Sequence, residues 1–178
     1  RSRPLTRLTP SLLCLLISLP AVAGPQVNSP RVMTGLHLSL PGQDLTEQAQ
    51  AFVSESRDQL LPGDSRSQVI TTRVIDSPLG QVVQMQQVFA GLPVFGKSLV
   101  VSFDSADQVR TVVSSLAPVQ GQPVHHELLS GAAAIKLAKS AFETTGRLRG
   151  EPQLKTVWLS GKEWIKAHLV TLPGAEPF

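Results

Sequence analysis

Residues 86–103 read QQVFAGLPVFGKSLVVSF, and this stretch decides the fold that we expect. Two apolar runs, residues 82–89 and residues 94–103, flank a four-residue connection at residues 90–93. Glycine adopts backbone angles that other residues avoid, whereas proline fixes its own φ and lacks an N–H donor. We therefore predict that the chain turns at residues 90–93 and forms a β-hairpin.

The first strand of this hairpin separates its side chains into two faces, as expected of a strand with one buried face. The face predicted to be buried is apolar and carries Val83, Met85 and Phe89. The opposite face mixes amides with valines and carries Val82, Gln84, Gln86 and Val88. The pattern thus predicts a sheet that packs against a core on one side.

The letters of this stretch also follow a family pattern, Q-x-aromatic-x-G-[IL]-PVFG-x-x-[LV]-x-V. In this chain the pattern falls on Gln87, Phe89, Gly91, Leu92, Pro93, Val94, Phe95, Gly96, Leu99 and Val101. Residues 86–112 thereby resemble the core of the fungalysin/thermolysin propeptide domain, found in the pro-regions of secreted thermolysin-type zinc metallopeptidases. Two features depart from the family: Phe89 stands where Tyr is usual, and residues 104–107 (Asp-Ser-Ala-Asp) stand where an Asp-Gly turn is common.

The resemblance implies a non-catalytic propeptide, an intramolecular chaperone and inhibitor of a secreted thermolysin-like zinc metallopeptidase. The implied partner is the cognate catalytic domain, which is absent from this chain, so zinc and calcium are expected only there and no cofactor here. The full-length precursor is then expected to be a zinc metalloendopeptidase. The candidate peptidase contacts are Gln87, Phe89, Gly91, Pro93, Val94, Phe95 and Gly96. The alternative role for these residues is to form the core of their own hairpin.

Residues 1–23 have the pattern of a secretory signal peptide. Three arginines precede a short apolar core at residues 12–19, and small residues then predict cleavage between Ala23 and Gly24. The apolar core is well short of the roughly 20 residues that span a bilayer. We therefore expect a secreted or periplasmic protein with no membrane contact after signal removal, the alternative being a membrane anchor.

Charge and cysteine content exclude several functions. The chain has 16 Lys and Arg against 13 Asp and Glu, and three of the basic residues lie in the predicted signal peptide. The remainder is near neutral and shows no basic stripe with interleaved aromatic residues, which argues against a nucleic-acid partner. Cys14 lies within the signal peptide, so the processed chain would have no thiol for disulfides, catalysis or metal binding.

Residues 24–40 are predicted to be a linker with a short strand at residues 35–40, and residues 41–121 a propeptide-like domain. Asp44 and Glu47 fit a helix capping box, and Pro62 and Gly63 end the helix. Its apolar face carries Leu45, Ala49, Phe52, Val53, Ser56 and Leu60. Four strands are predicted at residues 68–76, 81–89, 94–103 and 108–116. The expected fold is α+β, a helix packed on an antiparallel β-meander.

Residues 122–178 are predicted to form a second small module. A helix begins at Ser130 and runs to Thr145, where Gly146 ends it. Its apolar stripe carries Ala134, Leu137, Ala138, Ala141 and Phe142. Two strands follow at residues 153–160 and 164–172. This helix-plus-hairpin order resembles a PepSY-like, cystatin-like module, which we expect to be incomplete at Phe178.

The sequence His125-His126-Glu127 invites comparison with zinc proteases, whose motif needs two histidines four residues apart on one helix. The fourth residue after His125 is Leu129, and the fourth after His126 is Ser130, so neither pair fits. These histidines are expected to be exposed linker residues.

The sequence also lacks a glycine-flanked serine elbow, paired carboxylates and a phosphate-binding loop. His37 and His168 stand apart from other candidate groups. The runner-up hypothesis is therefore a standalone secreted or periplasmic protease-inhibitor or binding module. An enzyme with an unrecognised site is the third.

Overall fold

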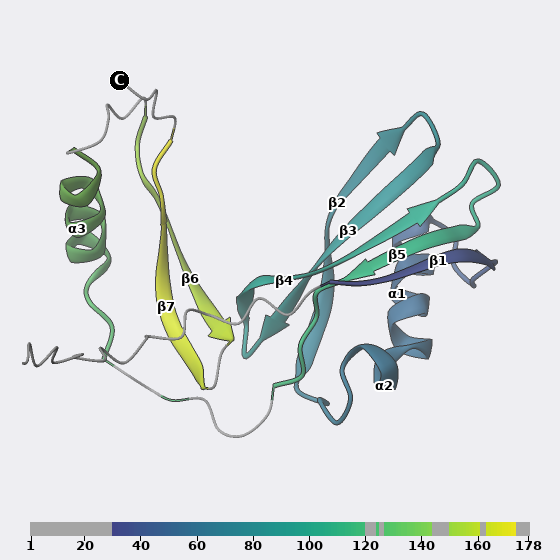
Figure 1. Ribbon diagram of the computed structural model, residues 1–178, viewed down its shortest axis with the longest axis horizontal. Helices are drawn as coiled ribbons and strands as arrows, with labels where there is room; N and C mark the ends of the chain where they lie inside the picture. Colours follow the sequence, from purple (N-terminus) through teal and green to yellow (C-terminus); the bar gives the residue numbers. More distant parts are fainter. Residues whose placement is uncertain (1–29, 120–123, 125–126, 144–149, 161–162, 174–178) are drawn as a thin grey trace, which may run out of the picture.

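The computed structural model describes residues 30–119, 124, 127–143, 150–160 and 163–173. A five-stranded antiparallel sheet with two helices forms one part, and a helix with a two-stranded hairpin, which pairs with the sheet through one strand, forms the other (Figure 1). The elements are β1 (Arg31–Leu38), α1 (Leu45–Glu55), α2 (Arg57–Leu60), β2 (Ser67–Ser77), β3 (Gly80–Phe89), β4 (Leu92–Phe103), β5 (Val109–Ser114), α3 (Gly131–Glu143), β6 (Gln153–Ser160) and β7 (Trp164–Thr171). The mixed α+β class is confirmed.

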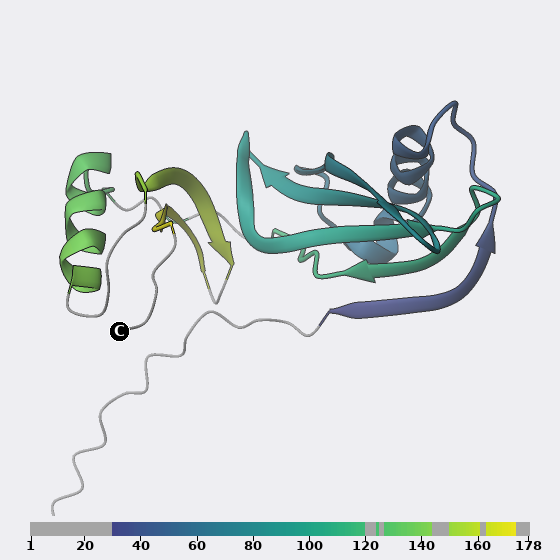
Figure 2. The ribbon, with the colours of Figure 1, turned by 90° about the horizontal axis from the view of Figure 1, so that it is seen from above.

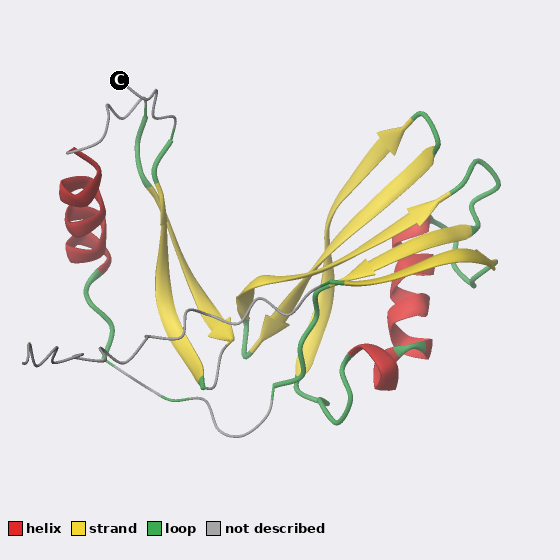
Figure 3. Cartoon of the chain, viewed as in Figure 1, coloured by secondary structure: helices red, strands yellow, loops and turns green. Residues whose placement is uncertain are grey.

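The larger part is an antiparallel sheet with strand order β1-β5-β4-β3-β2. Strands β2 to β5 follow one another as the predicted meander (Figure 3). The predicted linker differs from the structure, because β1 begins at Arg31 and pairs with β5 along the sheet edge. Gly35 has a φ of +70°, and the register shifts between Thr34 and Leu38. This irregularity breaks the period-two pattern of β1. For this reason the sequence predicted a strand only from residue 35 onward.

Helix α1 begins as predicted. The Asp44 carboxylate accepts a hydrogen bond from the Glu47 N–H (2.9 Å), and the Glu47 carboxylate accepts one from the Gln43 N–H (2.7 Å). The single predicted helix is instead two segments, α1 and α2, which meet at Ser56. The predicted apolar face is buried at Ala49, Phe52, Val53 and Leu60.

The two helices cover one side of the sheet and leave the other side open (Figure 2). The main core lies between α1, α2 and the inward side chains of the strands. It consists of Ala49, Phe52, Val53, Leu60, Leu61, Val69, Val83, Met85, Leu99, Val101, Phe103, Val109 and Val112. A second, smaller core lies between the two parts of the molecule and consists of Phe89, Val94, Val119, Trp158 and Trp164.

In the smaller part, the Ser130 hydroxyl caps α3 by accepting from the Ala133 N–H (3.2 Å), as predicted. Strands β6 and β7 pair along their whole length, from Gln153 with Thr171 to Ser160 with Trp164. The predicted apolar stripe of α3 is less buried than expected, because Leu137 is 63% exposed. Among the described helices, none is long and apolar enough to cross a membrane.

Several predictions lie outside the described residues. These are the signal peptide with Ala23 and Gly24, the histidines His125 and His126, and the helix end at Thr145 and Gly146.

Candidate functional site

The connection between β3 and β4 is shorter than predicted. Phe89 pairs with Leu92, so the turn consists of Ala90 and Gly91 alone. Their φ values are +46° and +76°. Positive φ at both central residues is the geometry of a type I′ turn, whose twist matches that of the flanking strands. Pro93 therefore lies within β4, opposite Val88.

A bulge follows directly in β4. Val88 pairs with Pro93 and Gln86 pairs with Ser98, so β4 contains extra residues between these pairs, and Gly96 adopts a φ of +67°. The Gln86 carboxamide holds the bulge by donating to the carbonyl oxygens of Val94 (2.7 Å) and Lys97 (2.8 Å). β4 bends at this end (Figure 2), as bulged strands do.

The bulge also decides which side chains point inward. Phe95 and Gly96 are both exposed, Phe95 by 48%, whereas Val94 and Lys97 on either side are buried. Burial lowers the pKa of Lys97, because removing the ammonium group from water disfavours its charged form.

The predicted contact residues thus divide into two groups. Gln87 and Val94 are fully buried and Phe89 is 6% exposed, so these three belong to the interior. The remaining four reach the surface to different degrees: Gly91, Pro93, Phe95 and Gly96. The hairpin motif therefore contributes three residues to the interior and leaves Phe95 as its exposed aromatic side chain.

Gln87 is a buried amide whose polar atoms are all paired. Its Nε2 donates to the Ser67 hydroxyl (3.0 Å) and to the Ala117 carbonyl (2.7 Å). Its Oε1 accepts from the Ala117 N–H (3.1 Å). Gln87 thereby ties the segment after β5 to the first residue of β2.

Asp64 forms the other half of this buried network. Its carboxylate accepts from the N–H groups of Arg66 (2.9 Å), Ser67 (3.0 Å) and Val119 (2.8 Å). Burial alone would raise the pKa of Asp64, but hydrogen bonds from the Ser67 side chain and from these N–H groups lower it below 3.8. The helical and strand patterns do not point to Asp64. Its position after Pro62-Gly63 is the signal in the sequence, since Asp often accepts backbone hydrogen bonds in turns.

The open side of the five-stranded sheet is almost free of charge. We call it the open face and define it by outward, cross-strand paired positions: Val32, Thr34, Gln68, Ile70, Arg73, Ile75, Val82, Gln84, Gln86, Val88, Pro93, Ser98, Val100, Ser102, Thr111 and Val113. Among them Arg73 carries the charge. Val32 and Ile70 are exposed, and the central positions are half-buried. Aliphatic residues here take places that polar residues usually hold on a solvated sheet face.

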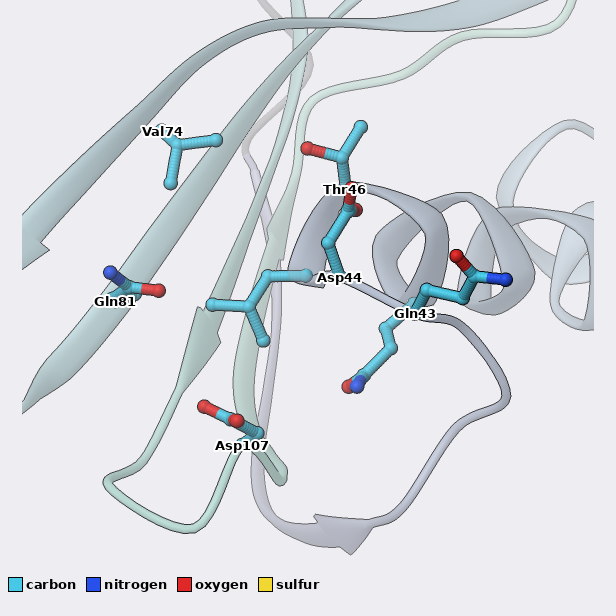
Figure 4. Close-up of a pocket in the computed structure, with 8 residues that line it drawn as sticks. Gln43, Asp44, Thr46, Val74, Gln81 and Asp107 are labelled. Atoms are coloured by element: carbon cyan, nitrogen blue, oxygen red, sulfur yellow. The ribbon is translucent and has the colours of Figure 1, made fainter.

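A polar pocket of about 330 Å³ lies where the start of α1 meets the ends of the strands (Figure 4). Gln43 and Asp44 approach it from the helix side, opposite Gln81 and Asp107. The Asp44 carboxylate already caps α1. Among the described residues, no group of three or more His, Cys, Asp or Glu side chains is placed to hold a metal ion.

The turn at residues 104–107 forms as predicted. The Asp104 carboxylate accepts from the N–H groups of Ala106 (2.9 Å) and Gln108 (3.1 Å). The hydrogen bond from Gln108, followed by that from Ala106, lowers the pKa of Asp104.

In β7, His168 places its Nε2 3.0 Å from the Leu129 carbonyl oxygen.

Comparison with known proteins gives one match. No curated protein and no solved structure matches this chain. The family described as the fungalysin/thermolysin propeptide motif matches residues 67–116. This range begins at the first residue of β2, ends just after β5 and includes all seven predicted contact residues. The chain thus carries the fungalysin/thermolysin propeptide motif that is typical of thermolysin-family propeptides.

Proposed function

We propose that this chain is a non-catalytic pro-region that assists the folding of a secreted thermolysin-like zinc metallopeptidase and inhibits the enzyme until the pro-region is removed. The propeptide motif at residues 67–116 supports the propeptide role. Export to the periplasm or the medium, a PepSY-like second module at residues 122–178, and zinc and calcium confined to the catalytic domain belong to the same proposal.

The open face is the observation that carries this proposal. Protein interfaces are depleted in charged residues at their centres, and large exposed apolar patches mark interaction sites. On the open face, Val82, Val88, Val100 and Val113 lie among uncharged amides and hydroxyls, with α1 and α2 on the opposite side of the sheet. We assign this surface to the catalytic domain of the peptidase.

Binding through such a surface would produce both proposed effects. Each Å² of apolar surface removed from water contributes about 25 cal/mol, offset by the cost of association. A pro-region that binds only the folded catalytic domain stabilises that domain by mass action. The buried residues Gln87, Phe89 and Val94 would act by holding the sheet in shape, and Phe95 would add an exposed aromatic contact beside it.

The test is inhibition of a thermolysin-like peptidase by the purified chain, measured as the rate of peptide hydrolysis. Val100→Lys places a charge at the centre of the open face, and we expect it to weaken inhibition about tenfold or more, since a buried unpaired charge is costly. Leu79→Lys is the matched control, because Leu79 is a turn residue between β2 and β3 that is 78% exposed, and we expect no change.

A second open-face variant, Gln84→Lys, keeps the test valid if Val100→Lys fails to fold, and circular dichroism verifies folding of each variant. Absence of inhibition by the unmodified chain at micromolar concentration would contradict the proposal. The gene beyond Phe178 gives an independent check. An in-frame HExxH segment supports the pro-region, whereas an early stop codon would instead favour the standalone inhibitor.

A further inference from the structure

The apolar residues of the propeptide motif face the second part of the molecule. Phe89 and Val94 pack with Trp158 and Trp164, which are 3% and 5% exposed. The Phe89 and Trp158 ring centroids lie 5.6 Å apart at 65°, and those of Phe89 and Trp164 lie 6.3 Å apart. Edge-to-face aromatic pairs of this kind stabilise beyond the area that they bury.

Hydrogen bonds fix the orientation of this contact. The Trp158 Nε1–H donates to the Phe89 carbonyl oxygen (2.9 Å). Val94 pairs with Trp158 in the parallel sense, so β4 joins β6 at the point where β4 bends. The bulge held by Gln86 makes this possible, because it carries Val94 away from its pairing with β3. The hairpin tip is therefore shaped for β6.

The segment that leads out of the first part is fastened at the same place. Val119 belongs to the small core with the two tryptophans, and Asp64 binds its N–H. The Arg66 guanidinium donates to the Val119 carbonyl oxygen (2.9 Å) and lies 5.3 Å from the Phe89 ring centre. On the other side, the Val124 N–H donates to the Trp164 carbonyl oxygen (2.9 Å). Val119 is thus held by Asp64 and Arg66, and Val124 is held by Trp164. These contacts do not depend on the covalent connection between Val119 and Val124.

From these contacts we infer that the tip of the β3–β4 hairpin is a docking site for the β6–β7 hairpin of the same chain, and that the two parts stay together without a covalent link. Gln87 and Phe89 lie on the same face of β3 and serve this site in different ways. Gln87 fastens the departing segment at Ala117, and Phe89 receives both tryptophans. The inference does not depend on the proposed inhibition, and its tests use no metallopeptidase.

The first test cuts the full chain. A recognition site for a sequence-specific protease is inserted between Val119 and Val124, and the purified protein is cleaved and passed over a gel-filtration column. We expect the two pieces to elute together at the position of the uncut chain, and to separate only in denaturant. Separation of the two pieces in native buffer would overturn the inference.

The second test uses the tryptophans as reporters, since the chain has only Trp158 and Trp164 and both lie in the docking site. We expect Phe89→Ala to shift native-state emission to longer wavelength and to increase acrylamide quenching several-fold. Phe52→Ala is the matched control, because Phe52 is equally buried but lies in the main core, and its emission should stay in place.

If Phe89→Ala does not fold, Phe89→Leu removes the ring contacts while retaining an apolar side chain, and the same emission shift is expected in a smaller amount. Equal emission shifts in the Phe89 and Phe52 variants would overturn the inference, because the tryptophans would then report general destabilisation.

Discussion

At the scale of single residues, the propeptide motif is divided between the interior and the surface. Gln87 is fully buried, and its side-chain amide forms hydrogen bonds with Ser67 and Ala117. A leucine has a similar size but could not form these hydrogen bonds. A buried polar group without a partner costs more than its hydrogen bond contributes. We therefore expect substitutions of Gln87 and Asp64 to cause large losses in the stability of the five-stranded sheet and its helices.

Gln87→Leu should lower the free energy of unfolding by about 2–4 kcal/mol, because it leaves the Ala117 N–H and carbonyl groups without partners. Urea denaturation followed by far-UV circular dichroism measures this loss. Gln84→Leu is the control on the open face and should change stability by no more than about 0.5 kcal/mol. Similar losses in both variants would contradict the role assigned to Gln87.

Asp64 should make stability sensitive to acid. Its folded-state pKa lies below the unfolded value of 3.8, so its stabilising contribution is fully present above that pH and is lost as pH falls through the folded pKa. We expect Asp64→Asn to flatten the fall of the urea midpoint below pH 3.8, relative to the unmodified chain. Identical profiles for Asp64→Asn and the unmodified chain would contradict the prediction.

At the scale of elements, the β3–β4 hairpin owes its shape to three positive φ values, at Ala90, Gly91 and Gly96. The first two close the turn, and the third opens the bulge that turns β4 toward β6. Alanine is a poor residue for positive φ, whereas asparagine tolerates it and is favoured at the first central position of type I′ turns. The turn is therefore not optimised for stability.

Ala90→Asn should raise the free energy of unfolding by about 0.5–1 kcal/mol, since it relieves backbone strain without changing a packed side chain. Gly91→Ala should lower it by about 1 kcal/mol. The space around the Gly91 Cα is open, so that cost comes from the backbone alone. Urea denaturation midpoints of the two variants test both predictions. A loss of stability in Ala90→Asn would contradict the assignment of a type I′ turn.

At the scale of the whole molecule, two parts of different size share a small core between them. The large part has its own core under α1 and α2, whereas the two tryptophans of the second part pack against the hairpin tip and Val119. The second part should therefore depend on the first for its stability. This arrangement predicts one cooperative transition rather than two.

Urea unfolding of the full chain should give the same midpoint by tryptophan fluorescence, which reports the docking site, and by far-UV circular dichroism, which reports the sheet. Leu99→Ala, in the main core, should lower both midpoints together, with a loss of about 2–5 kcal/mol. A fluorescence change at lower urea concentration than the circular dichroism change would mean that the second part detaches first, against this prediction.

The sequence by itself determined the local structure: the meander, the Asp44 helix cap, the Ser130 helix cap and the β6–β7 hairpin. These depend on alternation, capping residues and turn residues that lie close together in the chain. The sequence also contains the propeptide motif. It could not show, however, that Phe89 and Val94 are buried whereas Phe95 is exposed.

Only the tertiary structure decided which of these side chains are buried. It also decided that β1 lies at the sheet edge and that one face of the sheet stays uncovered by helices α1 and α2. The physical reason is that alternation tells which side chains share a face, whereas burial depends on what covers that face. Phe89 is covered by Trp158, a residue 69 positions away in the chain, and a backbone bulge reverses the inward pattern at Phe95.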